Sequence, residues 1–110
     1  MNKLNKQRVL STLVLLAVTG AAQADINIGV SVSATGPAAS LGIPEKNTFA
    51  ILPTSIAGEK INYIVLDDAT DPGQATKNAR KVVTEDKVDV LVGSSSTPAS
   101  AAIAEVANET

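Results

Sequence analysis

Apolar and polar residues alternate along residues 26–32, a pattern that is typical of a β-strand. The positions between the apolar ones are small, as at Gly29 and Ser31, so a helix can pack closely over that face too. Residues 60–67 have a strongly apolar interior and are predicted to form a second strand. Residues 88–92 are a short apolar run with one aspartate, which predicts a third, buried strand.

A loop and a helix are predicted between the first two strands. Turn-forming residues and small side chains favour a loop over residues 34–42. A short helix is then expected over about 43–52, with Pro44 near its first turn and Pro53 ending it. Gly58 marks a turn before the second strand.

Two further helices follow the second and third strands. Asp71 precedes a proline, and apolar residues then recur at helical spacing, which predicts a helix capped by Asp71 and running to about Glu85. Thr97 also precedes a proline and is predicted to cap a last helix that runs to the end of the chain. The order β-α-β-α-β-α predicts an α/β fold, a parallel sheet with helices on both faces.

The order of the strands predicts where a ligand would bind. Three parallel strands joined by right-handed crossovers most often lie in the order 2-1-3. The first and third strands then flank the point where the chain changes direction across the sheet, and ligands bind outside their carboxyl ends. The loops at that place are 34–42 and 93–97, and both are rich in Gly, Ser, Thr and Ala.

The second of these loops has two interpretations from its position alone. It leads into a helix N-terminus, whose N–H groups and dipole attract anions, so Ser94, Ser95 and Ser96 could form a cradle for a carboxylate. Alternatively, Thr97 only caps the helix and the three serines form a solvated loop.

The composition excludes several classes of protein. The 110 residues contain no Cys and no His, so this sequence holds no disulfide, no thiolate or imidazole metal site and no Ser–His–Asp triad. The 9 basic residues are outnumbered by 11 acidic ones and aromatic residues make up only 2%, which argues against nucleic-acid binding. Asp67, Asp68 and Asp71 lack the spacing of a calcium loop, and no dinucleotide or phosphate-loop motif occurs, so no metal or cofactor is expected.

Residues 1–24 have the pattern of a secretory signal peptide. Three basic residues within 1–8 precede an apolar run at 9–18, and a small-x-small site ends at Ala24. The apolar run is too short for a membrane anchor, which needs roughly 20 residues. Because Asp25 stands where a lipoprotein would carry its modified Cys, we expect a released, periplasmic protein.

Three segments follow one another along the rest of the chain: TGPAASLG at 35–42, DDATDP at 67–72 and VLVGSSSTPAS at 90–100. Together they closely resemble the branched-chain amino acid (Leu/Ile/Val-type) periplasmic solute-binding proteins of ABC transporters. The resemblance covers residues 26–110. It implies a type I periplasmic binding protein, of which residues 25–110 would form the first, incomplete part of the amino-terminal lobe.

The resemblance also implies a function and a site. Such a protein captures a branched-chain amino acid, or a related small carboxylate or amide, and delivers it to the membrane permease subunits of an ABC importer. The family holds the ligand carboxylate at the loop of Ser94, Ser95 and Ser96, which Thr97 follows. Leu41 stands where some members place an aromatic residue that touches the ligand, and its aliphatic side chain leaves the substrate class open.

Members of the family have two lobes that close on the ligand, so we expect a truncated chain that does not bind its ligand alone. One alternative is a stand-alone, exported α/β interaction domain. Another is an exported α/β hydrolase, which is disfavoured because the sequence lacks His and a Gly-x-Ser-x-Gly elbow. We therefore expect no enzymatic activity.

Expression in a bacterium with two membranes tests the predicted export. Intact-mass analysis of the periplasmic fraction should show a chain that begins at Asp25, because signal peptidase cleaves after a small-x-small site. A product that retains Met1 and stays in the membrane fraction would contradict this prediction.

Overall fold

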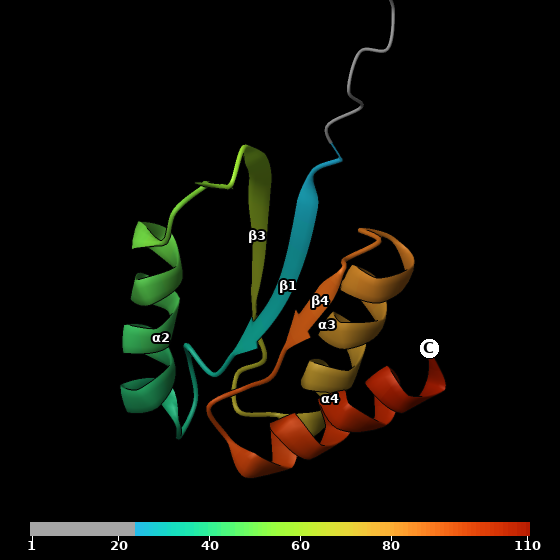
Figure 1. Cartoon of the computed structure of the whole chain (residues 1–110). Helices are drawn as coiled ribbons and strands as arrows, with labels where there is room; N and C mark the ends of the chain where they lie inside the picture. The colour runs from blue at the N-terminus through green and yellow to red at the C-terminus, as the bar shows by residue number, and fades with distance from the viewer. Residues whose placement is uncertain (1–23) are drawn as a thin grey trace, which may run out of the picture.

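Strands and helices alternate along the part of the chain that the computed structural model describes, residues 24–110. The predicted signal peptide at 1–24 therefore lies, except for Ala24, outside the described residues. Figure 1 shows the arrangement of the elements. They are β1 (Ile26–Val32), α2 (Ala39–Ile51), β2 (Ser55–Ile56), β3 (Glu59–Asp67), α3 (Pro72–Thr84), β4 (Val90–Val92) and α4 (Thr97–Glu109).

The four strands lie in the order β2-β3-β1-β4. The strand β1 pairs in parallel with both β3 and β4, which confirms the predicted 2-1-3 order of the three main strands. The short strand β2 was not predicted, and it pairs antiparallel with β3 across a tight turn at Ala57 and Gly58. The sequence did not reveal β2 because a strand of two residues is too short to show the alternation of apolar and polar positions. The predicted turn at Gly58 is confirmed, with a φ of 83°.

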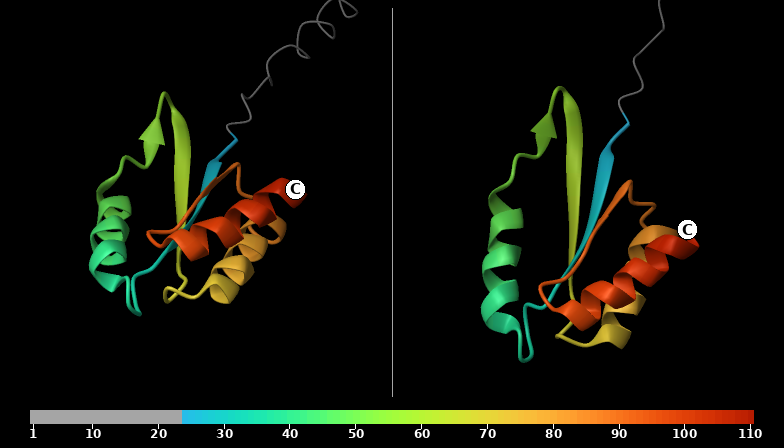
Figure 2. Two further views of the ribbon diagram at one scale, coloured as in Figure 1. Left: turned by 90° about the horizontal axis from the view of Figure 1, so that it is seen from below. Right: turned by 60° about the horizontal axis from the view of Figure 1, so that its bottom comes forward.

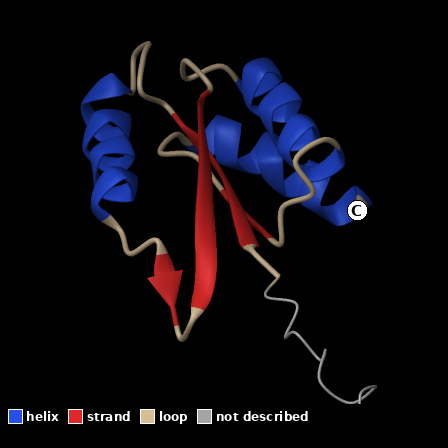
Figure 3. Ribbon diagram, turned by 90° about the horizontal axis from the view of Figure 1, so that it is seen from above, coloured by secondary structure: helices blue, strands red, loops and turns tan. Residues whose placement is uncertain are grey.

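Helices cover both faces of the sheet, as predicted. The helix α2 lies on one side, and α3 and α4 lie together on the other, as the views of Figures 1 and 3 show. The close approach expected over the small residues of β1 is also present, because a Cβ added at Gly29 would lie 2.8 Å from a methyl carbon of Val82 in α3. No helix within 24–110 has both the length and the apolar character needed to cross a membrane.

The helix α2 begins four residues earlier than predicted, so Leu41 and Gly42 lie in a helix and not in a loop. Pro44 is inside this helix, although the sequence placed it near the first turn. The early start follows from a contact far along the chain, because the N–H of Ala38 donates to Thr70 Oγ1 at 3.1 Å. The predicted end is confirmed, since the helix stops at Ile51, shortly before Pro53.

The segment around β4 differs from the prediction in two ways. The regular strand covers only Val90–Val92. At Asp89 the side chain accepts from the Asn27 N–H at 2.9 Å, and the Asp89 N–H donates to the Asn27 carbonyl oxygen at 2.8 Å. The residue before α4 is Ser96, not Thr97, and it makes no side-chain capping bond. By contrast, the predicted cap of α3 is confirmed, since Asp71 accepts from the N–H of Gln74 at 2.6 Å.

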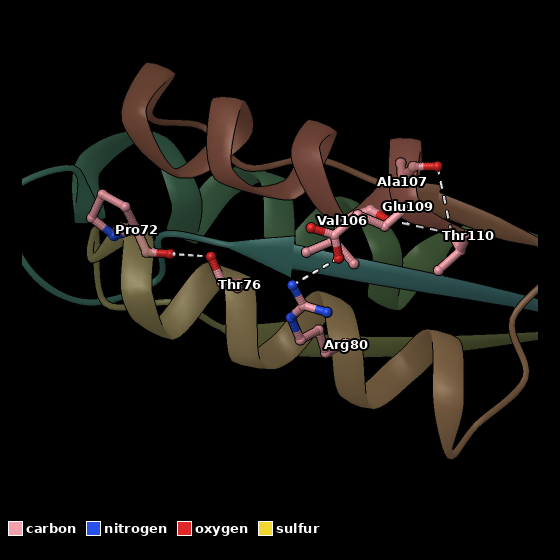
Figure 4. A network of polar contacts seen from close by, with 7 residues as sticks. All are labelled: Pro72, Thr76, Arg80, Val106, Ala107, Glu109 and Thr110. Atoms are coloured by element: carbon pink, nitrogen blue, oxygen red, sulfur yellow. Dashed lines mark hydrogen bonds and ion pairs between the residues drawn. The ribbon is translucent and has the colours of Figure 1, made fainter.

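The helices α3 and α4 form the main apolar cluster of the fold. Most of the side chains between them are alanines, and Figure 2 shows the two helices side by side from two directions. An ion pair of 2.8 Å between Arg80 Nη2 in α3 and Glu109 Oε2 at the end of α4 also joins the two helices, as Figure 4 shows. The buried members of the cluster are Ala75, Ala79, Ala99, Ile103 and Val106, with Leu91 packed against them.

Gly42 tests how tightly α2 is held against the end of β1. A Cβ at this position would lie 2.0 Å from the carbonyl oxygen of Ser33, so Gly42→Ala should destabilise the chain by about 1–3 kcal/mol in a denaturation experiment. Gly93→Ala is the matched control, because the added Cβ would meet only the side chain of Ser100, at an ordinary contact distance of 3.4 Å. Equal effects of the two substitutions would contradict this packing.

Candidate functional site

Three loops meet at the carboxyl edge of the parallel strands. The loop after β1 contains Ser33, the loop after β3 contains Asp68, and the loop after β4 contains Ser94. Because β1 pairs with both neighbours in parallel, all three loops leave the sheet at the same edge, which Figure 3 shows from above. This edge is where an α/β sheet with this strand order binds its ligand.

Asp68 is the fully buried centre of this edge. Its side chain has 0% exposure, and its carboxylate accepts hydrogen bonds from β1, from the loop after β1 and from its own turn. Ser31 Oγ donates to Oδ2 at 2.9 Å, and Ser33 Oγ donates to Oδ1 at 2.8 Å. The N–H of Thr70 donates to Oδ1 at 2.9 Å. A buried carboxylate is tolerated only when donors of this kind replace the water that it loses.

The serine loop is attached to this centre through Ser94. The hydroxyl oxygens of Ser33 and Ser94 are 2.9 Å apart. The carbonyl oxygen of Ser94 accepts a second bond, from Ser100 Oγ in α4, at 2.6 Å. The first serine of the loop is therefore held both by the sheet and by the helix that follows.

The other two serines of the loop have different surroundings. Ser95 Oγ donates to the Glu45 carboxylate, which reaches the loop from α2. Ser96 Oγ is buried and has no hydrogen-bond partner within residues 24–110. Ser96 directly precedes the first turn of α4, whose N–H groups have no partners within the helix itself. The loop thus brings an unused hydroxyl to the positive end of a helix dipole.

The remaining predicted site residues lie on helices. Thr97 is exposed in the first turn of α4, and Leu41 is 60% exposed in the first turns of α2. The structure therefore brings the three serines and Thr97 together at one helix start. It places Leu41 on the helix that also supplies Glu45.

Four residues of this edge were missed in the sequence, namely Ser31, Ser33, Asp68 and Glu45. The first two carried a usable signal, since serines at alternate positions of a buried strand need polar partners. Asp68 was noticed only as one of three aspartates. Glu45 carried no signal, because its contact with Ser95 joins positions 50 residues apart.

The three aspartates have separate structural tasks. Asp68 is buried among serines, Asp71 caps α3, and Asp67 binds Thr35. No group of three or more His, Cys, Asp or Glu residues within the described chain is arranged to hold a metal ion.

Asp67 ties the loop after β1 to the loop after β3. Its carboxylate accepts from Thr35 Oγ1 at 2.6 Å and from the N–H of Ala69 at 2.8 Å. Partial burial acts to raise the pKa of Asp67, but the hydrogen bonds from Thr35, Ala69 and the neighbouring backbone outweigh it and hold the pKa below its ordinary value of 3.8. Ala69 and Thr70 adopt left-handed backbone angles, with φ of 53° and 65°, so these bonds also hold a strained turn.

The comparisons with known proteins agree with this architecture. A family model described as periplasmic binding protein matches residues 25–110, and the chain belongs to this family. The fold is accordingly that of the first part of a type I periplasmic binding protein lobe. No match was found among curated proteins.

Several solved structures resemble this chain. An extracellular ligand-binding receptor from Rhodopseudomonas palustris is 56% identical, with a TM-score of 0.75 over 77% of this chain and 24% of that chain. A solute binding protein of an ABC transporter from strain BisB5 of the same species, in complex with 3,4-dihydroxy benzoic acid, is 32% identical, with a TM-score of 0.72 over 77% of this chain and 24% of that chain.

A leucine binding protein from Thermotoga maritima has the same fold, with a TM-score of 0.70 at 24% identity, over 76% of this chain and 25% of that chain. The chain thus spans about a quarter of the length of the solved proteins that it matches. These relatives are solute-binding receptors, and the family implies a location outside the cytoplasmic membrane.

The lowered pKa of Asp67 predicts an acid-dependent loss of stability. The stabilising contribution of a carboxyl group with a depressed folded-state pKa is complete above its unfolded-state pKa and disappears as the pH falls through the folded-state value. Asp67→Asn should cost about 1 kcal/mol at neutral pH, a low figure because the side chain is exposed, and nothing once the native carboxyl group is protonated. Denaturant titrations at several pH values measure this difference.

Glu105→Gln provides the control for Asp67→Asn, because it neutralises an exposed carboxylate on α4, away from the loop. A cost for Asp67→Asn that stays constant from neutral to strongly acidic pH would contradict the assignment.

Proposed function

We propose that the chain is part of the substrate-binding component of an ABC importer, and that it captures a small solute carrying a carboxylate. The observation that carries the proposal is the serine loop at the start of α4, where Ser96 Oγ is buried without a partner among the described residues. A carboxylate oxygen placed there would accept from hydroxyl and N–H donors at the positive end of the helix.

The relatives support a carboxylate as the recognised group. One related protein was solved with 3,4-dihydroxy benzoic acid, and another is described as a leucine binding protein. Both compounds carry a carboxylate, whereas their remaining parts differ. We infer that the loop of Ser94, Ser95 and Ser96, followed by Thr97, recognises the shared group, in a branched-chain amino acid or a related small carboxylate or amide.

Leu41 and Glu45 would contribute to the choice of ligand. Leu41 is exposed on α2, where an apolar part of the solute could cover it. Glu45 lies on the same helix and already accepts from Ser95, so a ligand carboxylate must share or displace that hydroxyl. An ammonium or hydroxyl group on the ligand would favour the neighbourhood of Glu45.

The proposal extends to location and partner. Residues 1–24 would direct export and be removed, and residues 25–110 would form part of a lobe in the periplasm. The complete protein would hand its solute to the membrane permease subunits of the importer, and it would not be an enzyme. Because the described residues supply only one wall of a two-lobed cleft, we expect the chain alone not to bind an amino acid at micromolar concentration.

A chimera tests the proposed site. Residues 25–110 would replace the matching quarter of the Rhodopseudomonas palustris receptor that is 56% identical, and calorimetry would measure binding of branched-chain amino acids and hydroxybenzoic acids. We expect the chimera to bind a carboxylate from this panel and not the corresponding alcohol. Ser95→Ala with Ser96→Ala should weaken that binding by about 1–3 kcal/mol, the range for hydrogen bonds to a charged group.

Ser55→Ala is the control for the double substitution, because Ser55 is exposed in β2, at the other end of β3 from the serine loop. A folded chimera that binds nothing from the panel, or equal affinities for the double variant and the control, would overturn the proposal.

A further inference from the structure

The hydrogen bonds beneath the serine loop have a direction that follows from Asp68. Asp68 Oδ1 is an acceptor, because it already accepts from the backbone N–H of Thr70, whereas a serine hydroxyl has a single hydrogen to donate. Ser33 Oγ lies 2.8 Å from Asp68 Oδ1, so its hydrogen is directed at the carboxylate. In the 2.9 Å contact between Ser33 and Ser94, the donor must therefore be Ser94.

This chain of bonds crosses the sheet from the loop after β3 to the loop after β4. It runs from Ser94 to Ser33 and from Ser33 to Asp68, and both Ser33 and Asp68 are 0% exposed. The bond between Ser33 and Asp68 is buried and is therefore not weakened by competition with water, whereas the contact between Ser33 and Ser94 is partly buried. The hydroxyl of Ser94 is therefore already bound to Ser33 before any ligand is present.

The carbonyl of Ser94 is held as well, by Ser100 Oγ at 2.6 Å. With both its side chain and its carbonyl bound, Ser94 sets the direction in which the chain continues through Ser95 and Ser96. The donors proposed to meet the ligand come directly after this fixed point.

We propose that Ser33 and Asp68 are positioning residues for the ligand loop: Asp68 sets the direction of the hydroxyl chain, and Ser33 anchors Ser94. Neither residue needs to touch the solute. The inference rests on the proposed function, because it assigns a purpose to the anchoring only if the loop binds a ligand. The inference assigns a role to two residues that lie beneath the serine loop, in addition to the residues proposed to contact the solute.

The chain offers a matched control in Ser31. Ser31 and Ser33 are both buried, and each donates one hydrogen bond to the same carboxylate, at 2.9 Å and 2.8 Å. Only Ser33 also contacts Ser94. Ser31→Ala and Ser33→Ala should therefore destabilise the fold by similar amounts, whereas only Ser33→Ala should release the serine loop.

Hydrogen exchange on the full chain measures this release without any ligand. In Ser33→Ala, the amides of residues 95–97 should exchange about threefold to tenfold faster than in Ser31→Ala, as expected for one lost hydrogen bond. Ser94→Ala removes the other end of the bond in a less buried position, and it should give the same increase at residues 95 and 97. The Ser96 amide is not compared in this variant, because its N–H also contacts Ser94 Oγ, at 3.5 Å. At residues 95 and 97, the variant with both Ser33→Ala and Ser94→Ala should exchange no faster than either single variant, because the bond between Ser33 and Ser94 is already lost in each of them.

Affinity in the chimera completes the test. Ser33→Ala should weaken carboxylate binding by about threefold to tenfold, and Ser31→Ala should leave it unchanged. If the Ser95 and Ser96 substitutions weaken binding but Ser33→Ala behaves like Ser31→Ala in both measurements, the positioning role is wrong and the proposed function stands. If exchange separates Ser33 from Ser31 but the Ser95 and Ser96 substitutions leave binding unchanged, the anchoring is correct and the proposed function fails.

Discussion

The buried carboxylate of Asp68 is the constraint on which this edge of the sheet depends. It follows β3, and two serine hydroxyls and one backbone N–H donate to it. Because removing a charged group from water is costly, these donors must be in place whenever the chain is folded. The carboxylate therefore fixes Ser31 in β1 and Ser33 directly after it, and through Ser33 it reaches the loop after β4.

Hydrogen bonds that hold the serine loop in one conformation suit a site that recognises a small anion. Donors that are already oriented do not lose further conformational freedom when the solute arrives, so more of their hydrogen-bond energy appears as affinity. The neighbouring contact of Asp67 with Thr35 holds the first loop against the turn at Ala69 and Thr70 in the same way.

Local patterns predicted the elements, and long-range contacts decided the details. The alternation along β1, the apolar interior of β3 and the Asp71 cap were sufficient for the three main strands, their order and α3. The start of α2 was missed because it depends on Thr70, and the pairing before β4 involves a side-chain contact between Asp89 and Asn27. The serine loop was predicted as a site from topology and resemblance. Its connection to Asp68 was not predicted, because each hydrogen bond in that connection joins residues at least 35 positions apart.

The central claim is that the serine loop, supported from below by Asp68, holds the carboxylate of a solute. A crystal structure of the carboxylate-bound chimera tests it most directly. The account predicts a ligand carboxylate oxygen within about 3 Å of the hydroxyl of Ser95 or Ser96, with Ser94 still bound to Ser33. A ligand whose carboxylate faces the opposite lobe, with no contact to residues 94–97, would contradict it.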